Sequence, residues 1–267
     1  MKKSIYKFTI LGCGSSGGVP RIGNDWGKCD PKNPKNFRSR CSLLVQKQNE
    51  NGITNLLIDS GPDMRTQLLK AKIAKLDGVI YTHFHADHIN GIDDLRMVAI
   101  NVKDLIPVWA DKKTSKKLYN SYNYIFNTPS GSKYPPILKL NKIKKIIKIQ
   151  GSGGLIEVKP LKVNHGEINS LGFKIQNLAY IPDVLEIPTK TWSFLKNLDV
   201  FIIDSLRRNP HPSHTHLDKT LLWIKKLKPK ISYLTNMHTD IDYDEIQKEI
   251  PKNVFPSFDG LKIELIY

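Results

Sequence analysis

Residues 82–88 carry the densest group of potential metal ligands in the chain, in the order Thr-His-Phe-His-Ala-Asp-His. Four of these side chains, His83, His85, Asp87 and His88, fall within six residues, directly after the apolar run 76–81. That run predicts a buried strand, so the four side chains would lie where the strand ends and its loop begins. Neutral imidazole and carboxylate together favour Zn²⁺, Mn²⁺ or Fe over Ca²⁺ or Mg²⁺. A solvated polar loop would explain one histidine better than four ligands at this spacing, so the motif predicts a metal site.

Further candidate ligands follow predicted strands in the second half of the chain. These strands are expected over 154–163, 171–181, 199–204 and 230–235. The polar residues that follow them are His165, Asp183, Asp204, Asn236 and His238. Ligand sites in open α/β sheets collect at the carboxyl ends of strands. His165 alone could equally be a turn residue, but recurrence at four strand ends indicates one common site.

The elements that would position these residues alternate between strands and helices. Strands are predicted at 5–12, 41–47, 53–59 and 106–110, with a turn at 49–52 between the second and third. Helices are predicted at 63–73, 94–101, 111–126 and 217–227. Asp59 closes an apolar strand, and a carboxylate there needs a partner, which the second N–H of a ligating histidine would supply. The Pro/Gly/Ser/Tyr-rich stretch 127–136 is the best candidate for a lid or an insertion.

Composition bounds the class of protein. The 267 residues allow one or two domains, and the absence of repeats or low-complexity linkers favours a single domain over 1–267. No apolar run approaches the ~20 residues that span a bilayer, so no membrane association is expected. Cys13, Cys29 and Cys41 have no CxxC spacing, which argues against a disulfide framework and predicts a cytoplasmic location.

The net charge of +16 leaves two interpretations open. Seven of the 41 basic residues are arginines, so 34 are lysines. The lysines are spread along the chain, which is typical of diffuse solvated charge. An anionic macromolecular partner is the less favoured alternative. Arginines lie mostly in the motif-bearing loops, and their planar guanidinium suits bidentate contact with phosphate. The arginines assigned to an anionic substrate are Arg38, Arg40, Arg207 and Arg208.

From the first strand to the last, the chain resembles the metallo-β-lactamase-fold hydrolases, and the His83-x-His85-x-Asp87-His88 motif is highly specific for them. The segments 11–20 and 58–61 and the late histidines are most similar to the PhnP-like phosphodiesterases, which cleave cyclic ribosyl phosphates, and somewhat less similar to ribonuclease Z. The resemblance implies an α/β fold, a four-layer αβ/βα sandwich, with two metal ions at one edge.

The resemblance also implies a role for each candidate residue. One metal would be held by His83, His85 and His165; the other by Asp87, His88 and a late histidine; Asp183 would bridge them. Asp59 and Asp204 would support the ligands by hydrogen bonds. Asp87 would orient the nucleophile, and His214, with His216 as a near alternative, would contact the phosphate and protonate the leaving group.

Two departures from the family pattern matter. The family's last ligand is a histidine where this chain has Asn236, so His238 is expected to take that role through a shifted loop, with Asn236 as a weaker substitute. The structural zinc of PhnP-like enzymes is not expected, because Cys29 is the one cysteine in the corresponding region.

The predicted function is a metal-dependent phosphodiesterase with two divalent cofactor ions, Zn²⁺ or Mn²⁺. It would cleave a small or cyclic phosphodiester by attack of a metal-bound hydroxide. An RNA-processing endonuclease of the ribonuclease Z type is the alternative: the charge favours it, but the long arm that grips tRNA is not evident in the sequence. A thiolesterase, a lactamase or a binding protein without catalysis would also fit the fold. A homodimer is compatible with all of these.

Overall fold

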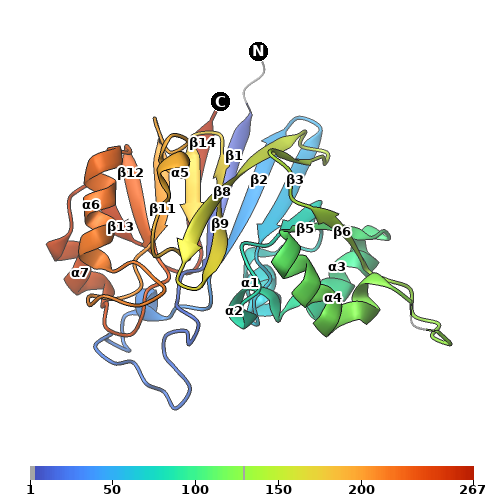
Figure 1. Ribbon diagram of the computed structural model, residues 1–267, viewed down its shortest axis with the longest axis horizontal. Helices are drawn as coiled ribbons and strands as arrows, with labels where there is room; N and C mark the ends of the chain where they lie inside the picture. Colours follow the sequence, from blue (N-terminus) through green and yellow to red (C-terminus); the bar gives the residue numbers. More distant parts are fainter. Residues whose placement is uncertain (1–3, 129) are drawn as a thin grey trace. The chain divides into compact units, whose positions relative to one another are not determined.

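The computed structural model describes residues 4–128 and 130–267, and the chain divides into two compact units (Figure 1). The first unit comprises Met1–Leu11, Ser42–Glu157 and Lys262–Tyr267; the second comprises Gly12–Cys41 and Val158–Leu261. Each unit is built on a mixed β-sheet. The expected single domain over 1–267 stays a prediction.

The first unit contains a seven-stranded sheet in the order β14-β1-β2-β3-β4-β5-β6 among the described residues. Its strands are β1 (Ile5–Gly12), β2 (Ser42–Asn49), β3 (Gly52–Ile58), β4 (Gly78–Ile80), β5 (Ile106–Ala110), β6 (Leu138–Lys142) and β14 (Leu261–Ile266). Its helices are α1 (Met64–Ala71), α2 (Ala86–Ile89), η2 (Ile92–Asp94), α3 (Leu95–Val102) and α4 (Lys112–Phe126), and the short strand β7 covers Ile147–Ile149. Buried side chains from both helices and strands, among them Leu57, Val79 and Leu118, form its core.

The register of the parallel strands brings the first motif together. β3, β4, β5 and β6 run parallel, and Ile58 pairs with Ile80. The residue that follows β3, Asp59, donates its backbone N–H to the Ile80 carbonyl at 2.9 Å. Asp59 therefore lies beside Thr82 and His83, which follow β4, because parallel strands end at the same edge of a sheet.

The second unit arranges six strands in the order β13-β12-β11-β10-β9-β8. They are β8 (Ile156–His165), β9 (Ile168–Ile175), β10 (Leu178–Ile181), β11 (Val200–Asp204), β12 (Ile231–Thr235) and β13 (Val254–Pro256). The helical segments are η1 (Pro34–Asn36), α5 (Thr189–Trp192), α6 (Leu217–Leu227) and α7 (Tyr243–Glu249). β10 to β13 run parallel, so Asp183, Asp204 and Asn236 follow three neighbouring strands at one edge.

Most predicted elements are confirmed, with one clear correction. The single strand expected over 171–181 is two antiparallel strands, β9 and β10. The chain reverses at Gln176, whose φ of 52° is left-handed, and at Asn177. The prediction treated 171–181 as one strand because apolar residues flank the exposed pair Gln176-Asn177 on both sides, and these flanking residues are buried in the same sheet. The short elements α5, α7, β13 and β14 were not predicted.

Two expectations concern segments outside these elements. The lid expected at 127–136 includes residue 129, which lies outside the described residues, and its closing over a site stays a prediction. Within the described part of the chain, none of the helices combines the length and the hydropathy needed to cross a membrane.

Candidate metal centre

In the first unit, the buried carboxylate of Asp59 organises the histidine motif. It is fully buried and accepts hydrogen bonds from the Thr82 backbone N–H at 2.8 Å, the Thr82 hydroxyl at 2.8 Å and His88 Nδ1 at 2.7 Å. Burial raises the pKa of Asp59, and the nearby His88 and the Thr82 hydrogen bonds lower it. Three donors thus compensate a carboxylate that would otherwise be costly to bury.

These bonds fix the tautomers of two histidines. Since Asp59 is an acceptor, His88 carries its proton on Nδ1 and keeps the lone pair on Nε2. The Thr82 hydroxyl already donates to Asp59, so it accepts from His83 Nδ1 at 2.9 Å, and the lone pair of His83 also lies on Nε2. Both imidazoles are buried, with Nδ1 held by a hydrogen bond and Nε2 as the candidate ligand atom.

The other two residues of the motif lie beside this pair. The ring of His83 is 4.5 Å from that of His85 and 4.3 Å from that of His88, centroid to centroid. Asp87 Oδ2 lies 3.3 Å from His88 Nε2, and its side chain is 17% exposed, against 1% for His88. All four predicted ligands of this unit are therefore close together, with Asp87 on the accessible side.

In the second unit, His165, Asp183 and His214 form a group whose possible ligand atoms lie within 4.8 Å of one another. His165 Nδ1 donates to the Ser213 carbonyl at 2.6 Å, which leaves its Nε2, 3.9 Å from Asp183 Oδ1, as the lone-pair nitrogen. The rings of His165 and His214 meet edge to face at 4.4 Å. Sequence reasoning placed each of these residues at the site, and the structure brings the three together.

Asp204 in this unit plays the part that Asp59 plays in the first. It is fully buried at the end of β11, where Oδ2 accepts from the Val184 N–H at 3.0 Å and from His214 Nδ1 at 2.8 Å, while Oδ1 accepts from Asn236 Nδ2 at 3.2 Å. Burial raises the pKa of Asp204 to about 7, His214 lowers it and neighbouring Asp183 raises it. The carboxylate holds His214 with its Nε2 directed away from the bond.

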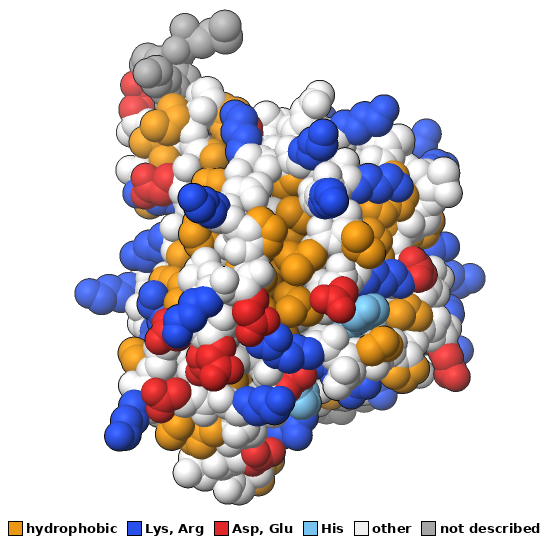
Figure 2. Space-filling model, turned by 90° about the vertical axis from the view of Figure 1, so that its left-hand side faces the viewer, with side chains coloured by type: hydrophobic (Ala, Val, Ile, Leu, Met, Phe, Trp, Pro, Cys, Tyr) orange, Lys and Arg blue, Asp and Glu red, His pale blue; other side chains and the backbone are white. Residues whose placement is uncertain are grey.

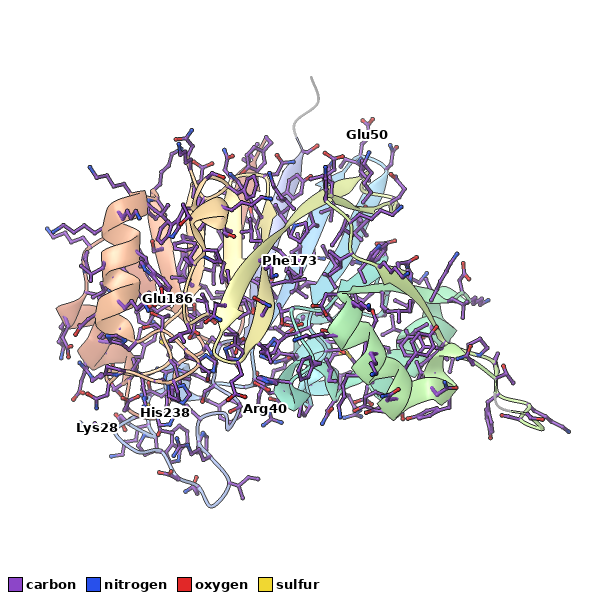
Figure 3. All side chains as sticks on the ribbon, viewed as in Figure 1. Lys28, Arg40, Glu50, Phe173, Glu186 and His238 are labelled. Atoms are coloured by element: carbon purple, nitrogen blue, oxygen red, sulfur yellow. The ribbon has the colours of Figure 1, made fainter. Side chains whose placement is uncertain are left out.

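Asn236, and not His238, lies beside this carboxylate pair. The amide of Asn236 is 3.5 Å from Asp183 Oδ1 and 3.1 Å from His214 Nδ1. His238 (labelled in Figure 3) places Nδ1 3.3 Å from Asp240 instead, and it belongs to none of the ligand groups found among the described residues. The role of His238 as last ligand through a shifted loop stays a prediction: in this structure Asn236 adopts a left-handed φ of 61°, and His238 follows two residues later.

Two other histidines lie in the same stretch of sequence as His214. His216, the alternative to His214, is the residue preceding α6 and is also outside the ligand groups of the described chain. His211 was not assigned a role from the sequence, but its ring lies 5.2 Å from that of His214. Burial, with neighbouring His214 and Arg207, lowers the pKa of His211 to about 4, so it stays neutral near pH 7. Its place in the run His-Pro-Ser-His-Thr-His was the available signal.

The arginines assigned to the substrate are mostly engaged in protein contacts. Arg38 is 1% exposed, and its guanidinium donates to the His238 carbonyl at 3.3 Å and to Asn36 Oδ1 at 3.2 Å, so its assignment to the substrate is corrected to a structural one. Arg208 forms a bidentate ion pair with Glu249, at 2.6 and 2.8 Å. Arg207 donates to the carbonyls of its own loop. Arg40, labelled in Figure 3, is half-buried. Their loop positions, the only signal in the sequence, do not distinguish substrate contacts from structural ones.

The donor set fits divalent metal ions. The first unit offers three imidazoles and the Asp87 carboxylate, and the second offers the His165 imidazole and the Asp183 carboxylate, with the His214 imidazole beside them. Imidazole nitrogen with carboxylate oxygen suits Zn²⁺ or Mn²⁺. The buried carboxylates that orient the imidazoles are the supporting groups that metal-binding histidines require.

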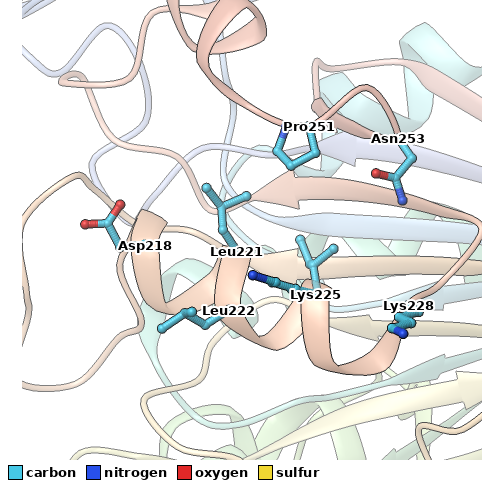
Figure 4. A pocket seen from close by; sticks show the side chains of 8 residues that line it. Asp218, Leu221, Leu222, Lys225, Lys228, Pro251 and Asn253 are labelled. Atoms are coloured by element: carbon cyan, nitrogen blue, oxygen red, sulfur yellow. The ribbon is translucent and has the colours of Figure 1, made fainter.

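A hydrophobic cavity elsewhere in the second unit has a different character. It measures about 590 Å³ and lies between α6 and the segment that precedes β13 (Figure 4). Its lining is Asp218, Leu221, Leu222, Ile224, Lys225, Lys228, Pro251 and Asn253. Figure 2 shows the side of the molecule on which α6 and α7 lie in Figure 1, where hydrophobic side chains gather between lysines. None of the metal-ligand groups found among the described residues includes a residue of this lining, so the cavity is not part of the candidate centre.

Known proteins similar to this chain identify its family. The β-lactamase superfamily domain matches residues 54–237, more than half of the chain. The chain belongs to the β-lactamase superfamily. A crystal structure described as a new diphosphatase from the PhnP family shares 33% identity with it, covers 99% of this chain and 98% of its own, and superposes with a TM-score of 0.88. The predicted fold class and the predicted relationship to the PhnP family are confirmed.

Two curated relatives of this superfamily member are described by other names. An octanoyltransferase of Porphyromonas gingivalis is 31% identical over 262 residues, which are 95% of this chain but only 50% of that protein. A ribonuclease Z of Clostridium kluyveri is 32% identical over 101 residues, 37% of this chain and 27% of that protein. The chain thus spans half or less of the length of these relatives. The enzyme class predicted from the sequence, a metal-dependent hydrolase, is the class of the PhnP-family and ribonuclease Z relatives.

Proposed function

We propose that the chain is a metal-dependent phosphohydrolase that cleaves a small anionic phosphodiester. The observation that carries the proposal is the pair of buried carboxylates, Asp59 and Asp204, each of which accepts a hydrogen bond from Nδ1 of a histidine and so orients its ring. Family membership supports the use of these histidines on metal, and similarity to a PhnP-family diphosphatase supports a phosphorus substrate.

The proposed ligands of two divalent ions, Zn²⁺ or Mn²⁺, are the predicted ones with one change. His83, His85 and His165 are assigned to one ion, Asp87 and His88 to the other, and Asp183 to both. The place of the last histidine goes to Asn236, and His238 leaves the set, because the amide of Asn236 lies beside Asp183. When bound, the ions supply charge neutralisation at the phosphoryl oxygens and activation of water.

The protein's own groups then have distinct tasks. Asp59 and Thr82 hold His88 and His83 in one tautomer, so no reorganisation is needed when ligands are engaged. Asp204 accepts from Nδ1 of His214 at 2.8 Å and stabilises its protonated form. A protonated His214 can donate from Nε2 to the leaving oxygen, which is general-acid catalysis. Asp87, the carboxylate of its motif and 17% exposed, would accept a proton from the attacking water.

Two other substrates have specific support. The PhnP-family relative is described as a diphosphatase, so a small diphosphate is the second candidate substrate. The ribonuclease Z similarity, though it covers 37% of the chain, keeps an RNA substrate as the third. Cleavage at phosphorus is common to all three.

The experiment has two parts. The purified protein loaded with Mn²⁺ or Zn²⁺ should contain about two equivalents of metal, and retention of none would refute the metal proposal.

Turnover is then compared on bis-p-nitrophenyl phosphate, a cyclic ribosyl phosphate, a nucleoside diphosphate and a precursor tRNA. The His214→Gln variant should keep its metals and lose turnover most on substrates with a poor leaving group, while His216→Gln, the matched control, keeps both. A His214→Gln enzyme with full turnover on all four substrates would remove His214 from the mechanism.

A further inference from the structure

The segment Lys112–Lys148 of the first unit has an unusual charge pattern. It contains ten of the 34 lysines and no aspartate or glutamate, although acidic residues number 25 in the whole chain. Its lysine density is about twice the chain average. Diffuse compositional charge would place acidic residues among the lysines, as in the rest of the sequence, so this segment is distinct.

All ten lysines are exposed. Four are on α4, at 112, 113, 116 and 117; one is in the following loop, at 133; five are on and after β6, at 139, 142, 144, 145 and 148. Among the described residues, Lys148 is the member of this set that forms an ion pair, with Glu157 at 3.5 Å. The others offer unneutralised positive charge on neighbouring elements, since α4 packs against β6. Such charge attracts a polyanion.

A tyrosine pocket lies within the same part of the first unit. It measures about 300 Å³ and is lined by Arg96, Tyr124, Ser132 and Tyr134. Tyr124 is 43% exposed and Tyr134 76% exposed, so both side chains are accessible from solvent. Exposed aromatic rings beside an arginine are a platform for stacking a planar group.

The pocket is shaped by local structure. α4 is kinked at Tyr122, whose φ and ψ of −135° and 38° are not helical and whose hydroxyl donates to Asn90 Oδ1 at 2.8 Å. This kink sets the direction of the last turn of α4, which carries Tyr124. The Tyr134 backbone N–H donates to the Ser132 hydroxyl at 3.1 Å and holds the loop side of the pocket.

Asp93 is the acidic group at this pocket. It lies 3.4 Å from the Arg96 guanidinium and contacts Tyr124. A carboxylate there disfavours a phosphate inside the pocket but accepts from the amino groups of a base. The charge distribution therefore assigns phosphates to the lysines and a planar base to the pocket.

We propose that the lysines of Lys112–Lys148 and the Arg96–Tyr124–Ser132–Tyr134 pocket bind single-stranded nucleic acid, with one base stacked on the tyrosines. Stacking on aromatic rings requires an unpaired base, which favours a single strand over a duplex. Binding to a lipid surface would require an apolar face that enters the bilayer, whereas the described lining of this pocket has no aliphatic side chain. This favours nucleic acid over a lipid surface. The inference does not depend on the proposed hydrolysis, because it concerns equilibrium binding.

The lysine contribution is tested by the salt dependence of binding. The full-length, metal-loaded protein is titrated into labelled 12-nucleotide single-stranded RNA or DNA, with fluorescence anisotropy as the measurement and a gel to show intact oligonucleotide. Each phosphate contact contributes about 0.7 to the slope of log K against log salt. Changing Lys112, Lys113, Lys116 and Lys117 together to Gln should reduce that slope by about 1.5 to 3. The control changes four exposed lysines of the second unit, Lys190, Lys225, Lys248 and Lys252, to Gln and should leave the slope unchanged.

The pocket is tested with Tyr124. Tyr124→Ala should weaken oligonucleotide binding about 5- to 160-fold, the range for one lost base stack, whereas Tyr124→Phe, which keeps the ring, should bind normally. Neither change should alter binding of inorganic polyphosphate, which has no base. The proposal would be overturned if the two fourfold lysine variants changed the salt dependence equally, or if Tyr124→Ala and Tyr124→Phe weakened binding equally. It would also be overturned if a 12-base-pair duplex bound more tightly than the single strand. A further refuting result is binding to phosphatidylserine vesicles, but not to the oligonucleotide, that depends on the α4 lysines.

Discussion

The substitution Asp59→Asn tests whether a buried carboxylate presets the histidine motif. An amide has nearly the same shape, but it replaces one acceptor oxygen by an NH₂ donor. Asp59 accepts from His88 Nδ1 and twice from Thr82 in the wild type. With one oxygen left for the Thr82 N–H, the amide nitrogen faces His88, which must move its proton from Nδ1 to Nε2. A protonated Nε2 cannot bind a metal ion.

The magnitude follows from two general ranges. Loss of a supporting partner of a metal-binding histidine costs about 10- to 100-fold in metal affinity. This corresponds to about 1.4 to 2.7 kcal/mol. A hydrogen bond to a charged group contributes about 1.5 to 3 kcal/mol, a range that overlaps the first. Because Asp59 and His88 are both almost completely buried, water cannot replace the lost bond, so the effect should lie in the upper half.

The assay is competition with a chromophoric chelator for Zn²⁺, together with thermal unfolding of the metal-free protein. Asp77→Asn is the matched control, since Asp77 lies in the same unit and accepts from the Asn55 N–H at 2.7 Å without contacting a histidine. It should change stability alone. Metal affinity of Asp59→Asn within twofold of the wild type, in a protein that folds, would refute the assignment of the tautomer to Asp59.

Three further predictions concern stability. Asn236→Asp places a carboxylate about 3.2 Å from Asp204 and removes a hydrogen-bond donor. Because like charges repel, the metal-free variant should have a lower melting temperature at pH 8 and recover part of the loss at pH 5, where protonation relieves the repulsion. Calorimetry measures this, and the absence of recovery at pH 5 would contradict it. Burial raises the pKa of Asp259 to about 6, so protonated Asp259 stabilises the folded state below pH 4 and this stabilisation is lost as the pH rises through 6. The free energy of unfolding of Asp259→Asn should therefore rise by about 2 kcal/mol relative to that of the wild type between pH 4 and pH 7, as measured by urea unfolding. A difference between the two proteins that does not change with pH would contradict this. Leu57→Ala, in the fully buried core of the first unit, should cost about 2 to 5 kcal/mol in the same assay, whereas exposed Leu69→Ala should cost far less.

The local chemistry could be predicted from the sequence because it depends on short-range patterns. The His-x-His-x-Asp-His motif, the carboxylate that follows β3 and the polar residues at the ends of β8, β10 and β11 were all identified from apolar runs that end in polar residues. Parallel strands bring such residues to one edge whatever the details of packing, so Asp59 could be paired with a histidine before its partner was known. The same reasoning missed the reversal at Gln176 because both flanking strands are buried and apolar.

The sequence by itself determined the family, the fold class and the types of ligand, since these depend on residue identity and spacing. Only the tertiary structure decided which side chains meet. It placed Asn236 and not His238 beside Asp183, through a left-handed residue at the end of β12, and it grouped His214 with His165 and Asp183. It also buried Arg38 and paired Arg208 with Glu249, although both looked available in the sequence. The physical reason is that burial and hydrogen-bond partners come from segments distant in the chain, and residue type alone does not specify them.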